Sequence, residues 1–172
     1  MKTGQRSKVK GQSRLLLAIA AAFACAEHSQ PSQIEPPAVR PDGIVAYLVA
    51  TPAAVPNEYI VRAVARRGVA VEDPGSFVAT VRLATRNIAF VSDASDANAL
   101  RVMSTSDTAL RVAAAAPEGL ASGELFAVRL RAPRASDLNS LQLEIGELND
   151  RSGATLKAAL VVLQHVSWVS PR

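Results

Sequence analysis

From residue 43 onward, the chain consists of short stretches in which apolar and polar residues alternate. In residues 76–84, four apolar side chains share one face at a period of two residues, and the polar side chains Ser76, Thr80 and Arg82 lie on the other face. The apolar side chains are those of Phe77, Ala79, Val81 and Leu83. Residues 124–132 and 141–145 alternate in the same way. A period of two predicts β-strands with one buried face.

Turn residues separate these stretches every eight to twelve residues, a spacing typical of a β-sandwich or a barrel. The last stretch, residues 156–166, is apolar on both faces, which predicts a central strand. No segment keeps a convincing helical period, and Pro117 limits any helix in the alanine run 113–116. The chain is therefore predicted to be all-β, with about nine strands. They cover residues 43–50, 58–66, 76–84, 87–92, 100–105, 109–115, 124–132, 141–145 and 156–166.

Residues 1–24 have the composition of a bacterial secretion signal. Five basic residues precede the apolar run Leu15–Ala24, and Cys25 follows directly. Ten apolar residues span about 15 Å as a helix, roughly half of a bilayer core, so this run is too short for a permanent membrane span. We therefore expect a signal peptide and an exported protein at the cell envelope.

Cys25 is the only cysteine, and two processing routes compete at this position. If Cys25 accepts a lipid, residues 22–25 form a lipobox and the mature protein is anchored in the periplasm or at the cell surface. If an ordinary signal peptidase acts, cleavage after Ala24 or after Ala26 fits the small-x-small rule. Because a lone cysteine cannot form an intramolecular disulfide, we expect lipidation, with this anchor as the only membrane contact.

Residues 25–42 form a proline-rich linker between the signal peptide and the strands. Pro31, Pro36, Pro37 and Pro41 stand there among polar residues, a composition that gives an extended tether and cannot bury a core. Residues 43–172 have the length of one domain.

The charge of the chain is carried by its first residues. The whole sequence has a net charge of +4 and a pI near 9.7, but residues 1–24 contain five basic residues and no acidic ones. Beyond residue 24, 14 Lys and Arg stand against 15 Asp and Glu. The high pI therefore gives no indication of a nucleic-acid partner.

Residues that could carry catalysis are scarce, so no enzyme activity is expected. The two histidines are His28, in the linker, and His165, which we interpret as a histidine on a strand face. No nucleophile-elbow motif accompanies His165. One cysteine and one histidine outside the linker cannot supply a Cys/His metal site.

Two acidic loops offer oxygen ligands of the kind calcium prefers, at residues 93–98 and 147–152. Neither loop has the glycine and the terminal glutamate of an EF-hand. Asp, Asn and Ser also dominate ordinary turns because their side chains cap the local backbone. We interpret both loops as turns, with calcium as the alternative and no other cofactor expected.

The order of these motifs resembles the cohesin-like β-sandwich domains of bacterial exported proteins. The matching stretches are Pro74–Val81, Ile88–Val91, Val112–Gly123, Leu125–Leu130 and Leu141–Leu156. The resemblance implies a nine-stranded jelly-roll β-sandwich over residues 43–172. It also implies a non-catalytic module for protein binding or scaffolding, whose partner is a dockerin-like domain or another envelope protein.

In the cohesin family, the partner docks on the sheet that contains strands three, five, six and eight. Carried over to this sequence, the outward side chains of that sheet are polar and of both charges. They are those of Thr80, Arg82, Arg111, Gln142 and Glu144. Charges of this kind govern approach and specificity more than affinity, so the resemblance implies a moderate, salt-sensitive interface.

The alternative function is a small carbohydrate-binding module of a polysaccharide-degrading system. Sugar sites stack rings on exposed aromatic side chains, and Phe77 and Phe126 fall on predicted core faces. Trp168, with Tyr47 or Tyr59, is left for such a surface. This hypothesis requires Trp168 and a tyrosine to form one exposed strip.

Overall fold

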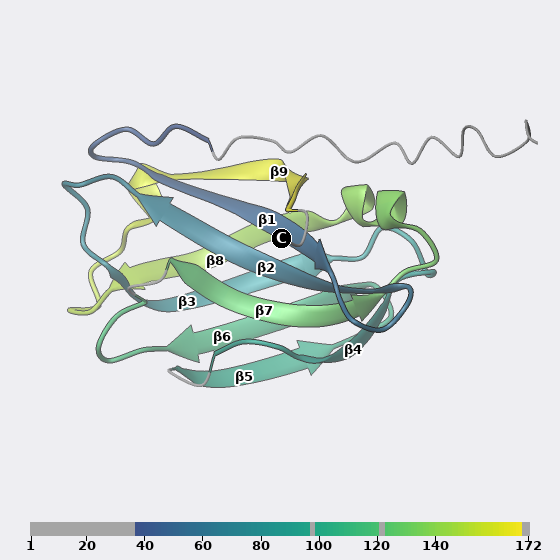
Figure 1. Ribbon diagram of the computed structural model, residues 1–172. Helices are drawn as coiled ribbons and strands as arrows, with labels where there is room; N and C mark the ends of the chain where they lie inside the picture. Colours follow the sequence, from purple (N-terminus) through teal and green to yellow (C-terminus); the bar gives the residue numbers. More distant parts are fainter. Residues whose placement is uncertain (1–36, 97–98, 121–122, 170–172) are drawn as a thin grey trace, which may run out of the picture. The chain divides into compact units, whose positions relative to one another are not determined.

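Nine β-strands form two sheets in the computed structural model, which describes residues 37–96, 99–120 and 123–169 (Figure 1). The predicted signal peptide, Cys25 and most of the predicted linker lie outside these residues. Within them, no helix has the length and apolar character needed to cross a membrane. The strands are β1 (Ile44–Pro52), β2 (Glu58–Arg67), β3 (Pro74–Arg82), β4 (Ala89–Asp93), β5 (Leu100–Thr105), β6 (Ala109–Ala115), β7 (Glu124–Arg131), β8 (Gln142–Asp150) and β9 (Leu160–Trp168).

The strand order is that of two stacked layers. One sheet has the order β4-β7-β2-β1-β9 and the other has the order β5-β6-β3-β8. Neighbouring strands run antiparallel, except that β9 pairs parallel with β1. The prediction of an all-β, nine-stranded jelly-roll sandwich is confirmed for the described residues. We call the β5-β6-β3-β8 layer the four-stranded sheet and the other layer the five-stranded sheet.

The core lies between the inner faces of the two sheets. The predicted inward residues of β3 are 0–2% exposed, and those of β7 are 0% exposed. Phe77 on β3 stacks on Phe126 on β7, with ring centroids 6.1 Å apart and an interplanar angle of 24°. This contact joins the two layers. The two-residue period in the sequence therefore assigned the buried faces of these strands correctly.

The last strand differs from its prediction. β9 begins at Leu160, after the short 3-10 helix η2 (Lys157–Ala159), and it lies at the edge of the five-stranded sheet. Val161 is 56% exposed, whereas Val166 and Trp168 are buried. The expected central strand is wrong because periodicity reports which side chains are apolar, and β9 has only β1 as a hydrogen-bonded neighbour.

A second 3-10 helix was not predicted. This helix, η1 (Ala135–Ser140), lies between β7 and β8, and it buries Leu138 completely. It is a short connector, and 3-10 segments of this length are common in that role. A single buried leucine in six residues carries no helical period that a sequence pattern could reveal.

The end of the predicted linker packs against the turn that follows β2. The Gly43 amide donates to the Arg40 carbonyl (3.0 Å), the Gly68 amide to the Gly43 carbonyl (2.9 Å), and the Ala70 amide to the Pro41 carbonyl (2.9 Å). A β-carbon at Gly68 would overlap the carbonyl oxygens of Arg40 and Pro41. Glycine at this position therefore allows the chain to approach so closely.

We expect Phe126→Ala to lower the free energy of unfolding by about 3–5 kcal/mol, because it removes a fully buried ring from the contact between the sheets. Urea denaturation measures this loss. The control is Val69→Ala, at a side chain that is 91% exposed, with an expected change within about 0.5 kcal/mol. Equal midpoints for the two variants would contradict the assigned core.

We expect Gly68→Ala to destabilise the domain by about 1–3 kcal/mol, because the new methyl group must displace backbone atoms of residues 40 and 41. Thermal unfolding of the variant checks this expectation. Gly146→Ala is the matched control, since its β-carbon would meet only the Val78 carbonyl oxygen at an ordinary 3.6 Å. A larger loss at Gly146 than at Gly68 would show that the linker end is not packed as described.

Candidate functional site

The outer face of the four-stranded sheet brings together the five side chains predicted for partner binding. Thr80 on β3 lies opposite Arg111 on β6 and, on its other side, opposite Glu144 on β8. Arg82 lies opposite Gln142 in the next row. Thr80 is half-buried, and the other four residues are exposed. These residues, separated by up to 64 positions in the sequence, therefore form one continuous polar area.

Arg82 and Glu144 form a bidentate ion pair on this face. Arg82 donates from Nε to Oε1 of Glu144 (2.6 Å) and from Nη2 to Oε2 (3.1 Å). The hydrogen bonds from Arg82 hold the pKa of Glu144 below its ordinary value, and the same bonds raise the pKa of Arg82. Both side chains are about half exposed, at 57% and 50%, so the pair adds little to stability. Its effect is to neutralise two charges of the face.

Two charged side chains of the same face have no such partner. Among the described residues, neither Arg111 nor Glu147 takes part in an ion pair. Both are exposed. Arg111 therefore presents an unpaired cation on β6, and Glu147 presents an unpaired anion on β8.

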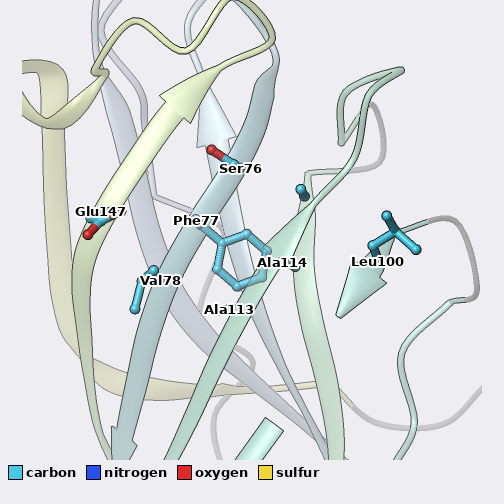
Figure 2. A pocket seen from close by; sticks show the side chains of 8 residues that line it. Ser76, Phe77, Val78, Leu100, Ala113, Ala114 and Glu147 are labelled. Carbon is cyan, nitrogen blue, oxygen red and sulfur yellow. The ribbon is translucent and has the colours of Figure 1, made fainter. Parts of the chain in front are cut away.

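The other half of the face is apolar and hollowed. Leu100 and Val102 of the edge strand β5 are 78% and 72% exposed. Beside them lies an open hollow of about 290 Å³. Its lining comes from all four strands of the sheet, as Figure 2 shows for the labelled residues. The lining residues are Ser76, Phe77, Val78, Leu100, Ala113, Ala114, Ala115 and Glu147.

This apolar half was not predicted from the sequence. The strand at residues 100–105 was expected, but no face was assigned to it, and its apolar alternation by itself favours a buried Leu100 and Val102. In the structure it is Arg101 that turns inward, with its side chain 10% exposed and Nη1 3.7 Å from Oδ2 of Asp93. The alanine pair Ala113 and Ala115, opposite two larger apolar residues, was the available signal.

The aromatic strip required for a carbohydrate module is not exposed. Tyr47 and Trp168 are 5% and 8% exposed. Trp168 packs edge-on against Tyr59, with centroids 5.9 Å apart and an interplanar angle of 85°, and its Nε1 donates to Oδ1 of Asn139 (3.3 Å). The exposed strip that the carbohydrate-binding alternative requires is therefore not formed, because Trp168 packs in the core.

One aspartate in each acidic loop uses a carboxylate oxygen in a turn, and Asn98 of the first loop lies outside the described residues. Oδ1 of Asp150 accepts hydrogen bonds from the amide and hydroxyl of Ser152 and from the Ala154 amide. The Ser152 hydroxyl in particular lowers the pKa of Asp150. Oδ1 of Asp93 accepts from the Ser95 amide and hydroxyl in the same way. In the part of the chain that the structure describes, no three His, Cys, Asp or Glu side chains are grouped to hold a metal ion.

The fold resembles that of solved cohesin structures. No family model matches the sequence, and no curated protein matches it. The sixth cohesin of scaffoldin B from Acetivibrio cellulolyticus, in complex with a Cel5 dockerin mutant, matches with a TM-score of 0.52 at 12% identity, over 75% of this chain and 99% of that chain. The type I cohesin–dockerin complex Coh-OlpA-Doc918 from Clostridium thermocellum gives 0.51 at 11% identity, over 74% and 99%.

A third match is a non-cellulosomal cohesin from the archaeon Archaeoglobus fulgidus, with a TM-score of 0.48 at 18% identity, over 76% of this chain and 91% of that chain. The two matches above 0.5 assign the fold of the described strands. The described strands therefore have a cohesin-like fold, as the resemblance of the sequence implied.

We expect Arg82→Gln to raise the pKa of Glu144 toward its ordinary value of 4.5, because the two hydrogen bonds from Arg82 are lost. Since the folded-state pKa of Glu144 is lowered, its stabilising contribution is present above pH 4.5 and is lost as the pH falls through the folded pKa. An NMR titration of the side-chain carboxyl groups measures the pKa. Asp150 is the internal control, and its lowered pKa should not move.

Proposed function

We propose that this protein is an exported, lipid-anchored, non-catalytic module that binds another protein with the outer face of its four-stranded sheet. The observation that carries the proposal is the exposure of Leu100 and Val102 beside the hollow on that face. Contiguous exposed apolar side chains rimmed by polar ones are typical of protein interaction sites. The polar rim here includes Arg111 and Glu147.

The cohesin-like fold supports a dockerin-like domain as the partner. The two solved structures described above with TM-scores of 0.51 and 0.52 are cohesins in complex with dockerins. A fold by itself does not determine function, so the proposal depends mainly on the outer face of the four-stranded sheet. Its mixture of an apolar half and a charged half suits an interface with an apolar centre and a polar rim.

The leader sequence supports export and anchoring. A basic segment, a short apolar run and Cys25 stand in the order of a lipoprotein signal. The proline-rich residues that follow would hold the domain away from the membrane. The binding face would then be accessible to a partner at the envelope.

Crosslinking in cell-envelope extracts recovers the partner, which is then purified. Calorimetry measures its affinity for the wild-type protein. We expect the double variant Arg82→Glu, Arg111→Glu to bind this partner about tenfold more weakly or worse, because charge reversal at an interface creates like-charge contacts.

The matched control is Arg40→Glu, Arg86→Glu, which makes the same charge change at two exposed positions outside the four-stranded sheet. It should bind as the wild type does. Unfolding curves of both variants show that the domain remains folded. Equal affinity of both double variants would rule out this face as the binding site.

A further inference from the structure

The hollow on the four-stranded sheet is a trough that follows β6. The outward side chains of β6 in this part are the small Ala113 and Ala115, which form the floor. Leu100 and Val102 of β5 lie opposite them on one side, and Val78 of β3 lies on the other. Since neighbouring strands are about 4.8 Å apart, the two walls stand about 10 Å apart. The alanines thus leave room where other strands carry larger side chains.

The volume of the trough suits one large side chain. The hollow has a volume of about 290 Å³, and solvent waters cover an exposed apolar floor of this kind. Releasing those waters by placing an apolar group against alanine and leucine carbon is favourable. The hollow is open to solvent. Figure 2 shows Leu100 and Val78 on either side of Ala113.

Two charged side chains near the trough could orient a bound segment. Arg111 is two residues before Ala113 on β6, about 7 Å along the strand, and it has no ion pair among the described residues. Glu147 lies in the row of Ala113, two strands away, next to Val78. Arg82 and Glu144 are already paired with each other. The unsatisfied charges are therefore one cation along β6 and one anion across the sheet.

We propose that the trough receives one bulky aliphatic or aromatic side chain of the protein partner, with a carboxylate of the partner at Arg111 and a basic group at Glu147. This inference rests on the proposed function and specifies the chemistry of the partner's contact segment. The apolar side chain supplies the buried area, and the two opposite charges fix the orientation of the segment on the sheet.

A displayed library of short random peptides, selected on the immobilised wild-type protein, tests the chemistry without knowledge of the natural partner. We expect the selected peptides to combine Leu, Ile, Phe or Trp with one acidic and one basic residue. Their affinity should fall about tenfold for Ala113→Leu, Ala115→Leu, which fills the trough. Ala89→Leu makes one such substitution at an exposed position on β4 of the other sheet, and it should bind as the wild type does.

A charge-swapped variant, Arg111→Glu with Glu147→Arg, tests the proposed orientation of the bound segment. Peptides with their acidic and basic residues exchanged should bind this variant about tenfold better than they bind the wild type. Failure to select any peptide, selection of peptides without the apolar residue, or equal binding to the trough-filled variant would overturn the proposal. Self-association of the wild type that is lost in the trough-filled variant would identify a second copy as the occupant, and would also overturn it.

Binding of the natural partner to the variants distinguishes a failure of this proposal from a failure of the proposed function. If the partner binds the trough-filled variant normally but loses affinity for Arg82→Glu, Arg111→Glu, the face is the binding site and the trough is not used. If neither variant changes the affinity, the proposed function on this face fails as well.

Discussion

The packing of the two sheets against each other is the interaction on which the rest of the structure depends. Phe77 and Phe126 meet at the centre of the core, and the neighbouring inward side chains of β3 and β7 are fully buried. Because each strand turns every second side chain inward, burial of this set places the remaining side chains on the two outer faces. The position of Thr80 and Arg82 on an outer face is thus a consequence of where Phe77, Ala79 and Val81 pack.

The strands that combine a buried and an exposed face were predictable from the sequence alone. The alternation in β3 and the first part of β8 predicted both their existence and their orientation, because a shift of one residue would expose the whole apolar set. The edge position of β9 was not predictable in this way. Its apolar residues are shared between a core-facing part, with Val166 and Trp168, and an exposed part, with Val161.

The candidate site was predictable in its polar half only. Arg82, Arg111 and Glu144 follow from the strand faces and from the resemblance to cohesins. The sequence did not show that Arg82 and Glu144 neutralise each other. These two residues are 62 positions apart and meet only when β3 pairs with β8. The apolar half of the face could not be predicted for another reason. Leu100 and Val102 alternate as core residues do, but in the structure Arg101 turns inward to Asp93, so β5 presents its apolar side chains to solvent.

That ion pair also limits how β5 can be used. β5 is the edge of its sheet, and an edge strand of six residues with an exposed leucine and valine invites further strands to add by backbone hydrogen bonding. Arg101 points toward Asp93 of β4, the edge strand of the opposite layer, so a charge bridge closes the open side of the sandwich. An incoming strand would have to place an inward-facing side chain next to this charged pair, which disfavours the apolar segments that drive fibril growth. The exposed leucine and valine are thereby kept for contacts made from above the sheet, and stacking of molecules edge to edge is discouraged.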